Sequence, residues 1–397
     1  MSDQSHDAAE SYPRQSARTQ RFTLGDPRDV TVSADGRRIV FLRSRGGTDP
    51  VNCLWVVDAT TGEERIVADP ELLLMRRDEF LPLEERARRE RTRESAGGIT
   101  AYATDRAGTV AAFTIAGRLF VAGLVSAAGR ELPVAGPVFD PRPDPLATRV
   151  AYVSGRLLCV GELDGRWRVL AGDDPDEPDT VSWGSADFIA AEEMNRFRGF
   201  WWSPDGTVLA ATRVDTAPVT RWFVGDPAVP STAPTEMPYP AAGTPNAEVS
   251  LHLLGLDGSV VDLEWDRQAL PYLVDVNWSE QGLVLTVQSR DQRRVEHLGV
   301  DPATGATTLL LGDDDEHWVE LVDGVPRLLP DGTLVTCADR DGARRLMVAG
   351  TPVTPADLQV RSVASVSADG IVFLANPLAD STVLHVWRRA PDGTLAA

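Results

Sequence analysis

A weak internal repeat with a period of about forty residues constrains the fold of this chain more than any other feature. In the clearest unit, β-prone apolar runs are separated by short turns that contain Asp and Gly, such as Ala34-Asp35-Gly36. Asp-Gly between apolar runs is a strong hairpin signal. The strands expected in this unit are residues 29–33, 38–43, 53–58 and 65–68.

The pattern returns along the whole sequence, so that seven units are visible. The later units begin near residues 99, 138, 201, 276, 329 and 366. Four-stranded units of this period predict an all-β fold, a β-propeller, because each blade buries its two faces against its neighbours. The alternative is a series of single-sheet sandwiches, but these do not require the turn to fall at the same place in every unit.

We therefore expect a disordered polar tail over residues 1–20 and a propeller over residues 21–397. Two short helices are expected to interrupt the strands. The first, over residues 82–95, is rich in arginine, and the second, over residues 185–198, carries two adjacent glutamates. In the second helix Ser185 is the expected N-cap, with Asp187 in the first turn. The proline-rich residues 218–246 are expected to form a long extended loop.

The charge of the chain excludes some classes of partner. Lys and Arg number 39 and Asp and Glu number 59, which gives a formal net charge of −20. Nucleic-acid binding is not expected from such a sequence, whereas a cationic ligand suits it. The N-terminal residues lack the apolar core of a signal peptide, and no apolar run approaches the ~20 residues that span a bilayer. We expect a cytoplasmic protein with no membrane partner.

The three cysteines do not form a recognisable framework. Cys53, Cys159 and Cys337 are far apart, and each lies in an apolar, strand-like run. Their spacing supports neither a disulfide network nor a zinc site. We expect buried free thiols.

The adjacent carboxylates of Glu192 and Glu193 are the strongest candidate for a binding site. On a helix their side chains diverge by about 100°, yet both can approach one ligand from the same side of a pocket. The two charges repel each other, and an ammonium group relieves this repulsion while offering three donors. The alternative is a solvated helix face. The flanking Ala190-Ala191 and Phe200-Trp201-Trp202 favour a packed environment instead.

The second candidate is a cluster of five arginines, Arg86, Arg88, Arg89, Arg91 and Arg93. Ion pairs with glutamates three or four residues away on the same helix explain most of this cluster. The alternative is that one arginine reaches into a central cavity and binds a substrate carbonyl, a role for which its rigid fork of donors is suited.

Signatures of catalysis are missing from the sequence. It contains no G-x-S-x-G nucleophile motif, no HExxH zinc motif and no GxxxxGK[ST] phosphate loop. The run Asp313-Asp314-Asp315-Glu316 lacks the spacing of a calcium loop and is expected to be a solvated turn. His252, His297 and His385 are expected on strands in structural or surface roles. We therefore expect no catalytic residue, no metal and no cofactor in this chain.

Residues 186–194 followed by residues 199–206 resemble the double-glutamate motif of the dipeptidyl peptidase IV subfamily. This subfamily belongs to the prolyl oligopeptidase class of serine peptidases. Residues 214–219 and 239–246 resemble the continuation of the same motif. The helix at residues 84–91, with residues 97–99, is similar to the arginine helix of the bacterial and cytosolic branches.

The resemblance implies an eight-bladed N-terminal propeller and a C-terminal α/β-hydrolase domain. Enzymes of this kind remove X-Pro or X-Ala dipeptides from free peptide N-termini. Glu192 and Glu193 would then bind the α-ammonium of the substrate. One of Arg89, Arg91 and Arg93 would contact the peptide carbonyl, with Arg91 favoured. The resemblance also implies a homodimer in the full-length form.

The sequence departs from this family in its C-terminal part. We expect it to end inside the seventh unit, without an eighth blade and without the hydrolase domain that carries the Ser-Asp-His triad. One hypothesis is therefore the recognition and gating propeller of a serine dipeptidyl aminopeptidase, inactive by itself. The alternative is a non-enzymatic propeller that binds peptides or proteins.

Overall fold

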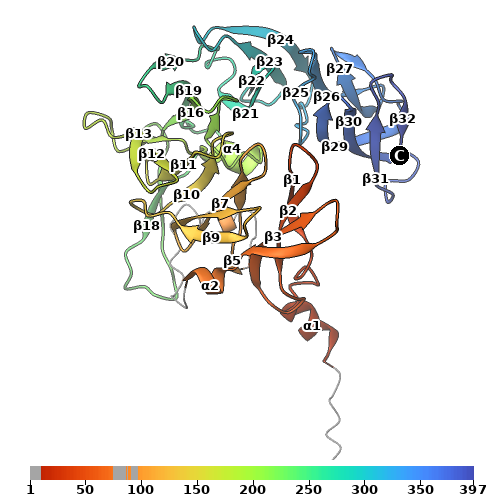
Figure 1. Cartoon of the computed structure of the whole chain (residues 1–397). Helices are drawn as coiled ribbons and strands as arrows, with labels where there is room; N and C mark the ends of the chain where they lie inside the picture. The colour runs from red at the N-terminus through yellow and green to blue at the C-terminus, as the bar shows by residue number, and fades with distance from the viewer. Residues whose placement is uncertain (1–9, 75–85, 87, 91–96) are drawn as a thin grey trace, which may run out of the picture. The chain divides into compact units, whose positions relative to one another are not determined.

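The computed structural model describes residues 10–74, 86, 88–90 and 97–397. The chain divides into two compact units, Met1–Pro175 and Asp176–Ala397. Regular structure in both units consists mainly of antiparallel strands in chain order, which Figure 1 shows as successive groups of arrows. The predicted all-β fold, a β-propeller of four-stranded blades, is confirmed. None of the helices in the described residues is long and apolar enough to cross a bilayer.

The described residues of the first unit form three sheets. The first has the order β1 (Arg28–Val32), β2 (Arg38–Ser44), β3 (Val51–Asp58) and β4 (Glu64–Ala68), and β5 (Gly97–Gly98) pairs parallel with β3. The second comprises β6 (Tyr102–Thr104), β7 (Val110–Ile115), β8 (Arg118–Gly123) and β9 (Ala128–Glu131). The third comprises β10 (Phe139–Pro143), β11 (Arg149–Ser154), β12 (Leu157–Glu162) and β13 (Trp167–Ala171). A short helix, α2 (Pro70–Leu74), follows β4.

The second unit contains four sheets of four or five strands, besides a two-stranded one. The first has the order β14 (Val181–Trp183), β16 (Val208–Asp215), β19 (Glu248–Gly255) and β20 (Val260–Asp262), with β15 (Phe200–Trp202) also paired to β16. The next comprises β21 (Tyr272–Ser279), β22 (Gly282–Gln288), β23 (Arg294–Val300) and β24 (Thr307–Asp314). It is followed by β25 (Arg327–Leu328), β26 (Leu334–Arg340), β27 (Ala343–Val348) and β28 (Thr351–Pro352). The last comprises β29 (Leu358–Ser367), β30 (Gly370–Pro377), β31 (His385–Arg389) and β32 (Leu395–Ala396).

The sheets pack face to face through clusters of buried apolar side chains, as the repeat predicts. On β7, Ala111 and Phe113 join the cluster shared with the preceding sheet, whereas Ala112 joins the cluster shared with the following one. Successive strand residues point to opposite faces. The middle sheet of the first unit therefore buries both of its faces, which a single solvent-facing sheet would not do.

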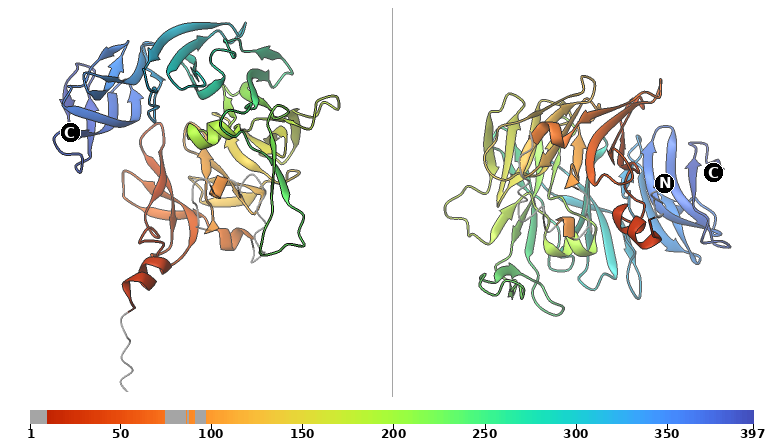
Figure 2. Two further views of the ribbon diagram at one scale, coloured as in Figure 1. Left: turned by 180° about the vertical axis from the view of Figure 1, so that it is seen from behind. Right: turned by 90° about the horizontal axis from the view of Figure 1, so that it is seen from below.

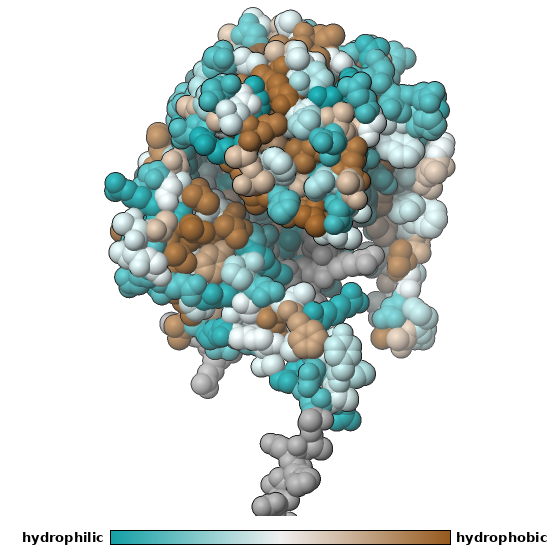
Figure 3. Space-filling model, turned by 90° about the vertical axis from the view of Figure 1, so that its right-hand side faces the viewer, coloured by the Kyte–Doolittle hydropathy of each residue, from teal (hydrophilic) through white to brown (hydrophobic). Residues whose placement is uncertain are grey.

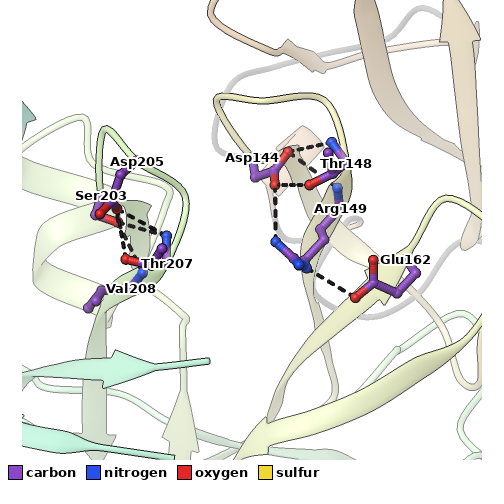
Figure 4. A network of polar contacts seen from close by, with 8 residues as sticks. All are labelled: Asp144, Thr148, Arg149, Glu162, Ser203, Asp205, Thr207 and Val208. Carbon is purple, nitrogen blue, oxygen red and sulfur yellow. Dashed lines mark hydrogen bonds and ion pairs between the residues drawn. The ribbon is translucent and has the colours of Figure 1, made fainter. Parts of the chain in front are cut away.

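One turn recurs between the first two strands of several sheets, and it is built in two chemical versions (Figure 4). In the serine version, Ser203 Oγ accepts a hydrogen bond from the amide of Val208 (3.0 Å) and donates to Asp205 (2.6 Å). In the aspartate version, the Asp144 carboxylate accepts from the amides of Thr148 (2.7 Å) and Arg149 (3.2 Å). In each version a side chain accepts from the amide five residues later. The same contact joins Ser33 to Arg38 and Asp105 to Val110. It also joins Ser289 to Arg294, in the turn between β22 and β23.

The structure corrects two expectations about irregular segments. The tail predicted to be disordered over residues 1–20 contains a helix, α1 (Tyr12–Arg18), which a proline in its first turn helps to start. Residues 218–246 are not simply an extended loop. They include a hairpin of β17 (Arg221–Val224) and β18 (Thr235–Pro238), which projects from its blade as an arm (Figure 2).

Two further corrections concern the C-terminal part. The last sheet has four strands, whereas the sequence pattern indicated an incomplete seventh unit. A turn at residues 390–394 leads from β31 into the fourth strand, β32. In this turn the amide of Ala390 donates to the carbonyl of Thr394 (2.9 Å). In the acidic run predicted to be a turn, Asp313 and Asp314 belong to β24.

Exposed apolar side chains are scattered over the surface of both units. On the arm, Phe223 is 68% exposed and Trp222 is 49% exposed. On the last sheet, Val386 of β31 is 61% exposed. Figure 3 shows brown, apolar residues interspersed with teal, hydrophilic ones on one face of the molecule.

Candidate functional site

The double-glutamate insertion interrupts the first strand of its blade. β14 precedes the insertion and β15 follows it, and both pair with β16. Trp183 lies opposite Arg213 of β16, and Phe200 lies opposite Ala211 of the same strand. One continuous strand therefore holds both ends of the insertion.

The two ends of the insertion approach each other closely. The Thr212 hydroxyl donates to the carbonyls of Ser185 (2.8 Å) and Gly199 (3.1 Å). An isolated bridge also pairs Ser185 with Arg198. A Cβ added at Gly199 would lie 2.5 Å from backbone atoms of Gly184 and Ser185. Only glycine fits this crossing without a shift of the backbone.

The insertion carries the helix α4 (Phe188–Glu193). Its N-cap is Asp187, whose carboxylate accepts a hydrogen bond from the amide of Ala190 (3.2 Å). The expected N-cap, Ser185, is instead held in the bridge to Arg198. Both residue types are good caps, so the sequence alone did not separate them.

Arg196 is buried directly behind this cap. It is 5% exposed, and its guanidinium forms an ion pair with Asp187 (3.0 Å). It also donates to the carbonyls of Leu273 on β21 (3.1 Å) and of Arg198 (2.8 Å). Burial lowers the pKa of the Arg196 guanidinium, and the nearby Asp187 carboxylate opposes this shift. The side chain thus links the start of α4 to the neighbouring blade.

Glu192 and Glu193 occupy the last two positions of α4, and both are exposed. Directly before them in the helix, Ala190 is 1% exposed and Ala191 is 8% exposed. The packed environment expected from the flanking residues is therefore present at the two alanines, and the two glutamates that follow them are exposed. At the C-terminal end of a helix, backbone carbonyls add to the negative potential. This arrangement suits a cationic ligand.

Aromatic residues connect α4 to the arm. Phe188 of α4 packs edge-on against Tyr239, with ring centroids 5.2 Å apart. Tyr239 also contacts Trp222 of β17 (4.8 Å). The two segments that resemble one family motif in sequence, around α4 and from residue 239, are thus in direct contact within the second unit.

Sequence reasoning missed Asp187 as the cap, Arg196 as its partner, and Tyr239 as the contact of α4. A signal for the arginine was present in the run Arg196-Phe197-Arg198-Gly199, because two arginines directly before a buried aromatic strand need buried partners. The Arg198 guanidinium lies 5.1 Å from the Trp201 ring centroid, and that of Arg196 lies 5.9 Å from it. No comparable local signal identified Tyr239.

The arginine cluster belongs to the first unit and is only partly described. Arg86 and residues 88–90 are helical, and Arg88 donates to the hydroxyl of Thr100 (2.8 Å). Arg89 is partly buried. Arg91 and Arg93, which the sequence also proposed as substrate contacts, lie outside the described residues.

Two of the three cysteines are buried, as expected from the sequence. Cys53 and Cys159 are buried free thiols, while Cys337 is only partly buried. Burial raises the pKa of Cys53 and of Cys159 to about 11, so neither thiol is a reactive nucleophile at neutral pH. Within the described residues, no group of three or more His, Cys, Asp or Glu side chains is arranged to hold a metal ion.

These features define a β-propeller in which one blade carries an acidic helical insertion on a split strand. Residues 117–388 match the family model described as the dipeptidyl peptidase IV (DPP IV) N-terminal region, and this match covers more than half of the chain. The chain therefore belongs to the family of dipeptidyl peptidase IV N-terminal regions.

A solved structure has the same fold. The chain is similar to dipeptidyl peptidase 4 of Porphyromonas gingivalis, with 17% sequence identity and a TM-score of 0.69. The similarity covers 93% of this chain and 52% of that protein. The chain thus spans about half the length of this enzyme.

Proposed function

We propose that this chain is the substrate-recognition and gating propeller of a serine dipeptidyl aminopeptidase. In this proposal, Glu192 and Glu193 bind the ammonium group at the free N-terminus of a peptide. Cleavage would be performed by an α/β-hydrolase domain, which supplies the nucleophile. The family of the chain supports the class of enzyme, and the chemistry of α4 supports the ligand.

The observation that carries this proposal is the position of the glutamate pair. Two adjacent, exposed carboxylates lie at the C-terminal end of a short helix in which the two preceding alanines are buried. An ammonium group placed there can donate to both carboxylates, and charge-assisted hydrogen bonds of this kind are the strong ones. An acylated N-terminus is neutral and has one N–H donor, so the site would discriminate against it.

The remaining parts of the proposal follow from the sequence resemblance. An arginine of the first unit, Arg89 or one of Arg91 and Arg93, would contact the peptide carbonyl. Proline or alanine would be preferred as the second residue of the substrate. The complete enzyme would be a cytoplasmic homodimer.

The proposal is tested by measuring calorimetrically how the 397-residue chain binds Ala-Pro amide and N-acetyl-Ala-Pro amide. We expect the wild-type chain to prefer the free amine. Glu192→Gln and Glu193→Gln should each reduce this preference by roughly tenfold, because each removes one charge-assisted hydrogen bond. Glu316→Gln is the matched control, since it makes the same charge change at a side chain that is 86% exposed elsewhere in the second unit. Equal binding of the two ligands by the wild type would refute the proposal.

A further inference from the structure

The helix that carries the glutamate pair is too short to be stable by itself. α4 comprises six residues, whereas isolated helices shorter than about 12–15 residues are marginal in water. Its position must therefore come from tertiary contacts. A buried polar contact of this kind is the ion pair between the cap of α4, Asp187, and Arg196, whose side chains are 10% and 3% exposed.

Arg196 contacts three separate parts of the second unit at once. It pairs with the cap of α4, it donates to the carbonyl of Leu273 on β21, and it donates to the carbonyl of Arg198, two residues before β15. In addition, the backbone amide of Arg196 donates to the carbonyl of Ala190 inside α4 (3.0 Å). The residue thus ties the cap and the interior of the helix to β21 and to the segment before β15.

The planar guanidinium explains why this residue is an arginine. Its N–H groups point in several fixed directions, so one side chain can donate hydrogen bonds to a carboxylate and to two carbonyls from different elements. Lysine has a single charged nitrogen on a flexible stem and cannot reproduce this arrangement. Removing the charge would leave Asp187 without its buried partner, which is costly.

We propose that Arg196 is a positioning residue for N-terminus recognition: through Asp187 it holds α4 so that the carboxylates of Glu192 and Glu193 can bind one ammonium group together. This inference rests on the proposed function of the glutamate pair. Arg196 does not touch the ligand. It acts on the orientation of the groups that do, and small misplacements of binding groups are costly.

The test compares binding of Ala-Pro amide and N-acetyl-Ala-Pro amide by the full chain and its variants. Arg196→Met should reduce the preference for the free amine by roughly tenfold or more, while the far-ultraviolet circular dichroism of the sheets is retained. Arg196→Lys, which keeps the charge, should recover part of the preference. A purely structural role would weaken binding of both ligands equally.

The matched control is Arg213→Met. Arg213 also forms an ion pair, with Glu177 (2.8 Å), and it lies on β16 of the same blade. This ion pair does not involve α4, so the variant should keep the wild-type preference.

If Arg196→Met does not fold, the double variant Asp187→Asn/Arg196→Met replaces it, because asparagine still caps the helix and no charge is left unpaired. Loss of the preference in either variant supports the inference. Retention of the preference in a folded Arg196→Met or double variant overturns it. If Glu192→Gln loses the preference while these variants keep it, only the role of Arg196 is refuted. If Glu192→Gln and Glu193→Gln also keep it, the proposed function fails as well.

Discussion

Near the start of the blades, a single side chain closes the first turn, and this side chain is a serine in some blades and an aspartate in others. Ser203 and Asp144 each accept a hydrogen bond from the amide five residues later, and so they close the first turn of their blades. Asp144 is fully buried, yet its carboxylate accepts from two amides and from the Thr148 hydroxyl. A buried carboxylate is tolerated when several donors satisfy it. This equivalence explains why the Asp-Gly signal of the repeat is weak in some units.

Also at the scale of single residues, His297 of β23 makes the free energy of unfolding dependent on pH. Its ring lies beside the Thr286 hydroxyl (3.0 Å), and burial lowers its pKa from 6.5 to about 4, against the opposing effect of Asp313. Between these two values the unfolded chain binds a proton that the folded chain excludes. The free energy of unfolding therefore decreases as the pH falls from 7 towards 4, by up to about 3 kcal/mol from this group. Below pH 4 both states are protonated, and the group contributes no further change.

His297→Gln should remove this component. Urea unfolding of both proteins between pH 7 and pH 4.5 should show a shallower pH dependence for the variant. Buried or hydrogen-bonded carboxylates such as Asp205, whose pKa is lowered by the Ser203 hydroxyl, are common to both proteins. Parallel curves for the two proteins would contradict the assignment.

At the scale of elements, the split strand is the feature that places the site. Gly199 occupies the point where the two ends of the insertion cross. Gly199→Ala should lower the free energy of unfolding by about 2–3 kcal/mol, because a methyl group there overlaps backbone atoms that cannot rotate away. Gly46→Ala is the control, since a Cβ at Gly46 meets nothing within 4 Å, and its effect should stay within about 0.5 kcal/mol. Equal urea midpoints for the two variants would show that the crossing is not tightly packed.

The elements also show what the sequence could and could not predict. The strands and their turns follow from local alternation and from Asp-Gly or Ser-x-Asp-Gly signals, so the propeller was predictable. The existence of α4 was predictable from its helix formers, but its cap was not, because Arg196 selects Asp187 through a contact that is distant from the local pattern. The arm was missed because β17 is exposed at every position, and so it lacks the alternation that identifies a half-buried strand.

At the scale of the whole molecule, the dominant property is the net charge of −20. A field of this sign attracts cations, and salt screens it over a Debye length of about 10 Å at 0.1 M. The affinity for Ala-Pro amide should therefore fall severalfold between low salt and roughly 0.5 M sodium chloride. N-acetyl-Ala-Pro amide, which is uncharged, should show little change in the same titrations. A free-amine affinity that does not depend on salt would contradict an electrostatic contribution.

The split strand has a consequence for how such a blade can be modified. Because β14 and β15 are both registered on β16, the register of the blade is set on either side of the insertion and not by its length. Residues between the two half-strands can be exchanged or lengthened while the pairings at Trp183 and Phe200 stay in place. The two half-strands thus form a fixed attachment site in the blade, between which a different recognition segment could be grafted.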